Sequence, residues 1–497
     1  MKRNSLILFF ILLTFFSKAQ ESRDLKMDWA GLARETGYNP APDWLLDAKF
    51  GIYFHWGVYS VPAFGDEWYP SRMFYKGTRE YQHHTETYGP PEKVGYDVFV
   101  PMFKAEYFNA KDWVDLFQEA GARFAGPVAE HHDGFVMWDS KITPWNAKLM
   151  GPHKDILGEL QKEIKGRGMK LVTTFHHSRL LQRYKIGDTK FDHSHYPAIA
   201  GLPTMSPNPM LRLLYGNIPA EDFYEPVWFG ELKEVIDNYS PDIIWFDSWL
   251  DMIPEKYRYQ FARYFIEEGK KKGQQPVICR KQDDLPLDVC IENLEKSRKQ
   301  NIESRLWMTD ETISTGSWCY TEGLEIKKAK DLIDVLIDIV SKNGVLMLNI
   351  SPKADGTIPF EQRDVLKEIG QWLKANGEAI YGTRPWYTYG EGPTVQPDGG
   401  FEFHQEFLKL KYSPEDVRYT TKGNNIYAIT LGVPQAGKDM VFKGFAKGKQ
   451  KQAPNVKNVS VIGSNQPLRW TLSDEGLRVS VPVIQGRNAV VFKIECK

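Results

Sequence analysis

The sequence has few cysteines and no excess of charge of either sign. It contains four cysteines among 497 residues, and no two of them have the C-x-x-C spacing: Cys279, Cys290, Cys319 and Cys496. Four are too few for a disulfide framework, and their spacing gives no cysteine-based metal site. The 63 basic and 64 acidic residues nearly cancel, so charge gives no reason to expect nucleic acid or an anionic membrane as partner. We therefore expect a neutral substrate.

Long apolar runs are also missing, except near the amino terminus. No stretch after residue 20 reaches the length of a membrane-spanning helix, so the sequence predicts no membrane insertion. Residues 1–20 combine Lys2 and Arg3 with an apolar run from Leu6 to Phe16 and with small residues around Ala19. This pattern predicts a secretory signal peptide over residues 1–20. We therefore expect export to the periplasm or to the extracellular space.

Aromatic residues are abundant, and one apolar run stands out among them. The chain contains 15 Trp, 24 Tyr and 28 Phe, which suit the apolar faces of sugars but also fill ordinary cores. Ile243–Phe246 runs directly into Asp247, which is typical of a buried parallel strand with an acid at its carboxyl end. Barrel enzymes carry their chemistry at such ends. An aspartate there is also a common turn or capping residue, but repetition of the pattern favours a catalytic Asp247.

The same pattern recurs along most of the chain, with amphipathic helices between the apolar runs. It predicts strands at 49–54, 122–129, 170–175, 241–248, 276–279, 287–291, 306–308 and 345–350. Helices are predicted at 112–117, 155–165, 228–239, 257–272, 326–341 and 360–376. These alternations predict a (β/α)8 TIM-like barrel over residues 21–384. Short alternating runs such as Ile426–Thr430 and Leu477–Val481 predict a C-terminal β-sandwich over residues 385–497.

Histidines and carboxylates collect where the predicted strands end. Two carboxylates in a pocket with neutral hydrogen-bonding groups and Trp rings suffice for glycoside hydrolysis. The groups that would then bind hydroxyls are His55, Glu67, His131 and His132. The His-His-Asp and His-His clusters could instead ligate zinc. Neighbouring residues on one strand point to opposite faces, which makes adjacent histidines poor joint ligands and favours the sugar.

Several longer motifs resemble the α-L-fucosidases of glycoside hydrolase family 29. They occur in the family's order and include KFGIYFHWGVYS (49–60), EWY (67–69), EHHDGFVMW (130–138), IWFDS (244–248), GSWCY (316–320) and LMLNISPKADGTIP (346–359). The resemblance implies a retaining exo-hydrolase of fucosylated oligosaccharides or glycoconjugates. It also implies a covalent fucosyl-enzyme intermediate and neither metal nor other cofactor.

The resemblance assigns roles to individual residues. Asp247 matches the nucleophile, and Trp318 matches the aromatic residue near the methyl group of the sugar. The fucose-binding set is matched by His55, Glu67, Trp68, His131 and His132. We also expect His176, His177 and Arg280, at the ends of the third and fifth strands, to line the pocket. A fucose-binding lectin without turnover and a metal-dependent hydrolase are the alternatives.

The general acid is predicted in the charged stretch that precedes the seventh strand. Glu295-Lys296-Ser297-Arg298 resembles the segment that carries the acid in one branch of the family. Glu292 and Glu311 are the other candidates. In retaining glycosidases the two carboxyl groups lie about 5–5.5 Å apart, so the acid is expected at this distance from Asp247.

Overall fold

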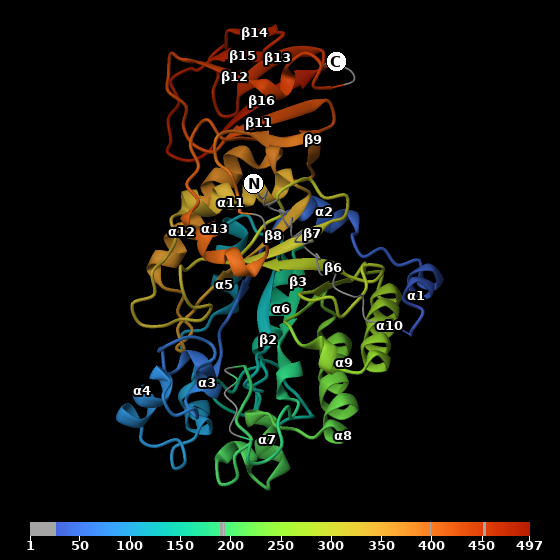
Figure 1. Ribbon diagram of the computed structural model, residues 1–497, viewed down its shortest axis with the longest axis vertical. Coiled ribbons are helices and arrows are strands. Elements are labelled where there is room, and N and C mark those ends of the chain that lie inside the picture. Colours follow the sequence, from blue (N-terminus) through green and yellow to red (C-terminus); the bar gives the residue numbers. More distant parts are fainter. Residues whose placement is uncertain (1–25, 189–191, 193, 398, 451–453) are drawn as a thin grey trace, which may run out of the picture.

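The computed structural model describes residues 26–188, 192, 194–397, 399–450 and 454–497. The predicted signal peptide, residues 1–20, lies outside these described residues. Among the helices in the described part of the chain, none combines the length and the apolar character needed to cross a membrane. The chain forms a barrel with surrounding helices and a separate group of C-terminal strands, which lie at the top of Figure 1.

Eight parallel strands close into a barrel in sequence order, with β1 paired to β8. They are β1 (Phe50–Phe54), β2 (Phe124–Glu130), β3 (Lys170–Phe175), β4 (Ile243–Phe246), β5 (Val277–Arg280), β6 (Ile291–Glu295), β7 (Trp307–Thr312) and β8 (Gly344–Ile350). In β4, Ile243 and Trp245 pack inside the barrel, while Ile244 and Phe246 pack outside it. Because both faces are buried, such a strand is apolar throughout.

Six long helices cover the outside of the barrel: α5 (Ala110–Glu119), α6 (Ile156–Gly166), α9 (Gly230–Tyr239), α10 (Glu255–Lys271), α11 (Ala329–Ser341) and α12 (Phe360–Asn376). The sequence marks some of their starts: Asp155 caps α6 by accepting a hydrogen bond from the backbone N–H of Gly158, at 2.9 Å. Before β1 lie α1 (Trp29–Thr36) and α2 (Asp43–Ala48), and α2 contributes Leu45 and Ala48 to the barrel interior.

Four short helices lie in the long segments that follow β1 and β3, at the bottom of Figure 1. They are α3 (Tyr69–Arg72), α4 (Arg79–Thr87), α7 (Pro209–Tyr215) and α8 (Ala220–Phe223). These segments start at the carboxyl ends of barrel strands, which is the end where barrel enzymes carry their active sites.

The predicted barrel is confirmed, but its middle differs from the prediction. The sixth strand was predicted at 287–291, whereas β6 is Ile291–Glu295. Ile291 lies inside the barrel and Asn293 on the same face contacts Asp310, so polar residues occupy positions where the prediction required apolar ones. Residues 281–306 are all described, and the links from β5 to β6 and from β6 to β7 contain no helix. The alternation of strands and helices is therefore interrupted at this point.

The C-terminal part consists of two antiparallel sheets packed on a common core, as predicted. One sheet has the order β13-β16-β11-β10-β9 and the other β12-β15-β14. Their bounds are β9 (Arg384–Glu391), β10 (Val417–Lys422), β11 (Asn425–Thr430), β12 (Asp439–Phe442), β13 (Val456–Val461), β14 (Trp470–Ser473), β15 (Gly476–Ser480) and β16 (Val490–Cys496). A short helix, α13 (His404–Lys409), lies between β9 and β10. Phe442 and Leu477 of one sheet share this core with Val459 and Phe492 of the other.

The C-terminal sheets rest on α11 and α12 of the barrel. The Trp372 indole N–H of α12 donates to the carbonyl of Ala489, at 2.8 Å. Arg418 of β10 donates from Nε to Asp338 Oδ1 of α11, at 2.6 Å. Figure 1 shows the C-terminal strands above these two helices and α3, α4 and α7 at the opposite end of the molecule.

Candidate active site

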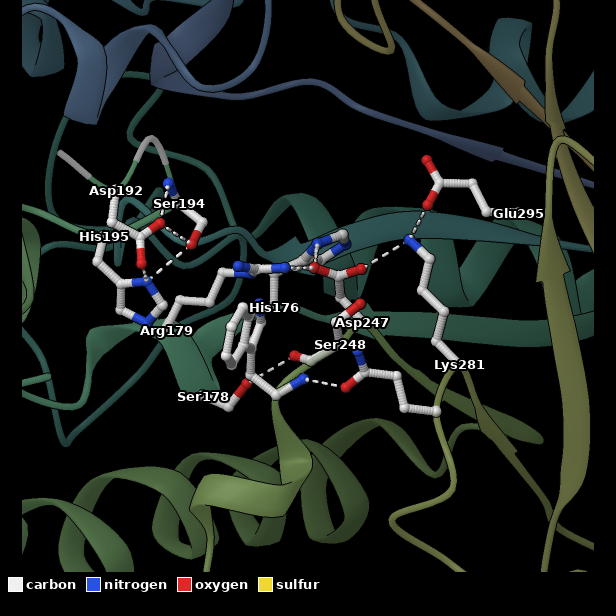
Figure 2. A network of polar contacts seen from close by, with 12 residues as sticks. His176, Ser178, Arg179, Asp192, Ser194, His195, Asp247, Ser248, Lys281 and Glu295 are labelled. Carbon is white, nitrogen blue, oxygen red and sulfur yellow. Dashed lines mark hydrogen bonds and ion pairs between the residues drawn. The ribbon is translucent and has the colours of Figure 1, made fainter. Parts of the chain in front are cut away.

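Asp247 lies directly after β4, with both carboxylate oxygens in contact with cations. Its Oδ2 accepts hydrogen bonds from Arg179 Nε and Nη2, at 3.1 and 3.0 Å. Its Oδ1 accepts from Lys281 Nζ at 2.8 Å. Figure 2 shows Arg179 and Lys281 on opposite sides of the carboxylate. The end of β3 fixes the backbone, because the N–H of Asp247 donates to the carbonyl of Phe175.

The charge of Asp247 follows from this environment. The residue is 5 % exposed, and its burial opposes ionisation. Lys281 and Arg179 outweigh burial, and together with His176 they hold the pKa of Asp247 well below its usual range. His176 contributes through Nδ1, which lies 3.5 Å from Oδ2. Asp247 is therefore an anion at neutral pH, as a carboxylate nucleophile must be.

Glu295 ends β6 and faces Asp247 across the mouth of the barrel. Its Oε2 lies 2.6 Å from Lys281 Nζ, the same ammonium that contacts Asp247 (Figure 2). Since one nitrogen contacts both side chains, the two contacting oxygens cannot be more than about 5.5 Å apart, which fits the 5–5.5 Å of retaining glycosidases.

The other two candidate acids lie away from Asp247. Glu292 is three positions before Glu295 on the same strand, so it points to the opposite face, where it pairs with Lys299 at 2.7 Å. Glu311 of β7 pairs with Lys327 at 2.8 Å, beside α11 on the outside of the barrel. The structure therefore brings Glu295, and neither alternative, to Asp247.

Three histidines from three strand ends form a wall beside Asp247. The ring centroid of His55 lies 5.3 Å from that of His131 and 5.4 Å from that of His176, and the last two are 4.4 Å apart. Burial, the largest effect on each ring, lowers the pKa of all three. They are therefore neutral imidazoles, each with one donor and one acceptor nitrogen for a hydroxyl-bearing ligand.

Around Asp247, several polar side-chain atoms of the histidines and of Arg179 are buried without a hydrogen-bonding partner. They are His131 Nδ1, both ring nitrogens of His132, His176 Nε2 and Arg179 Nη1. Buried polar atoms are normally hydrogen-bonded. A group of unpartnered atoms around one carboxylate is therefore suited to a polar ligand.

Aromatic residues and a carboxyl group adjoin the histidines: the ring centroid of Trp318 lies 5.4 Å from that of His55. Trp68 stacks on His132, with ring centroids 4.2 Å apart. Glu67 Oε2 accepts the backbone N–H of Trp318 at 3.2 Å, and burial raises the pKa of Glu67 to about 7. Glu67, Trp68, Glu295 and Trp318 line one cavity of about 580 Å³. The candidate acid therefore borders a cavity, together with a carboxyl group and two Trp side chains.

Comparison with known proteins identifies the family to which this arrangement belongs. The family model of α-L-fucosidases matches residues 12–378, and the model of their C-terminal domain matches residues 412–495. The chain belongs to the α-L-fucosidases of glycoside hydrolase family 29. It is 29% identical over 480 residues to tissue α-L-fucosidase of Homo sapiens, covering 94% of this chain and 89% of that protein.

Solved structures of a bacterial fucosidase agree with this result. The crystal structure of Thermotoga maritima α-fucosidase superimposes with a TM-score of 0.72 at 26% identity, covering 94% of this chain and 99% of the other. The same enzyme in complex with a mechanism-based inhibitor gives a TM-score of 0.73 at 25% identity, with the same coverage of 94% and 99%. The predicted family and fold class are confirmed.

In the present chain, two residues that were predicted to line the pocket point away from it. His177 lies on the outer side of β3, where its ring stacks on Trp228 at 5.9 Å and its Nε2 lies 3.0 Å from the Trp228 carbonyl oxygen. Arg280 faces the loop after β5 and donates to Asp283 Oδ1 at 2.6 Å and to the Leu285 carbonyl. The structure does not bring His177 or Arg280 to Asp247. Strand alternation explains both cases, because each residue follows an inward-facing neighbour.

The two cations at Asp247 were not predicted. The alternation of β5 contains a signal for Lys281, because Cys279 faces the barrel interior and the next residue on that face is Lys281. Arg179 has no comparable signal. It follows β3 by a turn of 3₁₀-helix over His177–Leu180, and this turn returns its side chain to the pocket. Simple alternation does not extend across such a turn.

The alternative prediction of a metal site concerned adjacent histidines, whereas the structure groups histidines from three different strand ends. His55, His131 and His176 each offer a ring nitrogen within 4.8 Å of the other two. The adjacent pair His131 and His132 lies past the end of β2, so its rings are on one side, 4.0 Å apart, and do not point to opposite faces. A metal in the pocket would therefore be bound by one histidine from each of three strand ends.

Proposed function

We propose that this fucosidase is an exported retaining exo-enzyme that removes terminal α-L-fucosyl residues from oligosaccharides or glycoconjugates. Asp247 is the nucleophile, and Glu295 is the general acid and base. The observation that carries the proposal is the single ammonium of Lys281, which contacts both carboxylates and limits their separation to that of a retaining pair.

The first step forms a covalent intermediate. Asp247 attacks the anomeric carbon as the bond from that carbon to the leaving oxygen breaks, and Glu295 gives its proton to this oxygen. Arg179, His176 and Lys281 hold the carboxylate, and its short link to β4 keeps it at the sugar. Rigid placement of the attacking group is worth several orders of magnitude in rate.

The second step reverses these roles. Glu295, now a carboxylate, takes a proton from water as the water oxygen attacks the anomeric carbon. The ester bond to Asp247 breaks, and its electron pair returns to the carboxylate. The product keeps the configuration of the substrate because each step inverts it once. Lys281 contacts both groups in the structure and is thus placed to balance this exchange of charge.

The pocket walls supply recognition of a neutral sugar. The imidazoles of His55, His131, His132 and His176 and the carboxyl group of Glu67 are suited to hydroxyls, and Trp68 and Trp318 to the apolar face and methyl group. This chemistry requires neither metal nor other cofactor. The Thermotoga maritima α-fucosidase has been crystallised with fucose, at 25% identity to this chain, which supports fucose as the sugar. Export is supported by the signal-peptide pattern of residues 1–20.

Turnover of an aryl α-L-fucoside, followed by proton NMR, tests this proposal. The first fucose released should be the α-anomer, and the β-anomer as first product would contradict retention. A lectin would bind fucose without any turnover. Activity should persist in the presence of a chelator such as EDTA. Loss of activity with EDTA, together with bound zinc that is absent from His55→Gln and His131→Gln, would instead indicate a metal at His55, His131 and His176.

A further inference from the structure

A second cluster of polar residues lies behind the histidine wall, outside the pocket. It consists of Glu130 at the end of β2, His177 just after β3 and Glu231 in the first turn of α9. Each of the three is 1 % exposed. The cluster therefore joins two barrel strands and a covering helix in a place closed to solvent.

The two carboxyl groups have no cationic partner. Among the described residues, no ion pair involves Glu130 or Glu231. After burial itself, the residues that raise the pKa of Glu130 well above its usual range are all acidic: Glu231, Asp133 and Glu234. Burial likewise raises the pKa of Glu231 to about 8. A buried acidic pair of this kind has to bind protons or a cation.

The orientation of His177 favours a cation. Its Nε2 lies 3.0 Å from the Trp228 carbonyl oxygen, so this nitrogen carries the proton and donates. Nδ1 is then left with a lone pair, and it is buried without a hydrogen-bonding partner. A histidine that ligates a metal usually donates its other ring N–H to a carbonyl or carboxylate in this way.

The distances between the three groups also favour a bound cation. One ligand atom from each of Glu130, His177 and Glu231 lies within 4.8 Å of the other two. No hydrogen bond or ion pair among the described residues joins His177 to either carboxyl group. Glu130 and Glu231 hydrogen-bond to each other, which requires a shared proton, whereas His177 Nδ1 is satisfied by neither of them. The three groups are near enough for a single atom between them to contact all three.

We propose that Glu130, His177 and Glu231 bind one divalent transition-metal ion, with zinc as the test metal. One imidazole and two carboxylates are a donor set used for zinc, and the ion would neutralise both acids. It would touch no reacting atom. Its effect on the pocket would be indirect, because Glu130 and His177 are the chain neighbours of His131 and His176, whose rings face the sugar site.

The test measures zinc by mass spectrometry in untagged protein purified without chelator. We expect one zinc ion per chain in the wild type. The near-isosteric variants Glu231→Gln and His177→Gln should each lower zinc content about tenfold or more. Glu234→Gln is the matched control, because it lies one helical turn further along α9, where it binds the Trp138 indole N–H at 3.0 Å. It should retain the ion.

Three results would overturn the proposal. The first is wild-type protein without zinc that is folded and fully active, which would leave the fucosidase proposal intact. The second is zinc that persists in both Glu231→Gln and His177→Gln, because the ion would then lie elsewhere. If these variants do not fold, anomalous scattering from wild-type crystals at the zinc absorption edge locates the ion. A peak absent from Glu130, His177 and Glu231 is the third contradicting result.

Discussion

Asp247 and Asp338 are buried carboxylates that each lie between two cations, and their surroundings differ. Asp247 in the barrel mouth contacts Arg179 and Lys281. Asp338 of α11 contacts Arg418 at 2.6 Å and Lys342 at 2.9 Å, at the junction with the C-terminal sheets. In both places burial opposes ionisation, and two cations outweigh it and hold the pKa below its usual value.

The difference between the two clusters lies in how completely they are hydrogen-bonded. Asp338 also accepts from Gln396 Nε2 at 2.7 Å, and none of the buried polar side-chain atoms of Asp338, Lys342 or Arg418 is without a partner. The Asp247 cluster leaves Arg179 Nη1 and several imidazole nitrogens unpartnered. A complete network stabilises a domain junction, whereas an incomplete one is suited to a ligand. Changes at Asp247 and its neighbours should therefore affect turnover, whereas changes at Asp338 should affect stability.

The largest effect is expected from Asp247→Ala. Removal of the nucleophile should lower kcat on an aryl α-L-fucoside by about four orders of magnitude or more. Azide should restore part of the activity, because it can occupy the space left by the Asp247 carboxylate and attack the anomeric carbon there. The product should be a fucosyl azide of inverted configuration. The melting temperature serves as control for folding. A variant that is only mildly impaired would remove Asp247 from the chemistry.

Glu295→Ala should show a loss that depends on the leaving group. With a natural sugar as leaving group, kcat should fall by about 10²–10⁴, the usual contribution of a general acid. An activated aryl fucoside needs no protonation, so its first step should be much less affected. Glu292→Ala, on the opposite face of the same strand, is the matched control. The selective pattern in Glu292→Ala or Glu311→Ala instead would move the acid to that residue.

Asp338→Ala should separate stability from activity. Loss of one partner of a buried pair leaves Lys342 and Arg418 uncompensated and should lower the free energy of unfolding by about 3–5 kcal/mol, as measured with urea. The folded variant should keep its kcat, since the cluster lies outside the pocket. Asp331→Asn on the same helix, whose carboxylate is 3.6 Å from Lys411 at the surface, should change stability by less than about 1 kcal/mol. An Asp338 variant of normal stability would contradict a structural role.

The smallest effect is a shift in pH dependence on removal of Lys281. Its ammonium favours the ionised form of Asp247, so Lys281→Met should raise the pKa of Asp247. The acid limb of kcat/KM should then move to higher pH by about one unit or more. In the wild type we expect this limb below the ordinary aspartate pKa of about 3.9, because the pKa of Asp247 is lowered. Lys281→Arg keeps the charge and should restore the wild-type limb. An unchanged limb in Lys281→Met would show that this cation does not control Asp247.

The sequence predicted the barrel where physical patterning is strong. Four apolar residues before Asp247 defined β4, and the predicted helix at 360–376 coincides with α12. The prediction of the sixth strand was wrong because the inward-facing positions 293 and 295 are polar. Asn293 hydrogen-bonds Asp310, so that strand lacks the apolar pattern on which the prediction relied.

The candidate site was predictable in part. Asp247 and His55 directly follow strands, so the pattern of strand ends indicates them. Contacts between strand ends cannot be predicted from this pattern, because they depend on the shear of the closed barrel and on loop geometry. The alternation of β5 distinguishes Lys281 from Arg280, but sequence position could not reveal that a turn returns Arg179 to Asp247.

Labelling with a 2-fluoro-fucosyl fluoride tests the central claim most directly. The fluorine slows hydrolysis of the intermediate, so a fucosyl ester should accumulate on the nucleophile. Peptide mass spectrometry after proteolysis should find the label on Asp247, in the peptide that contains Ile244–Ser248. A label on Glu295, Glu67 or any other carboxylate, or inactivation without a covalent adduct, would contradict the account.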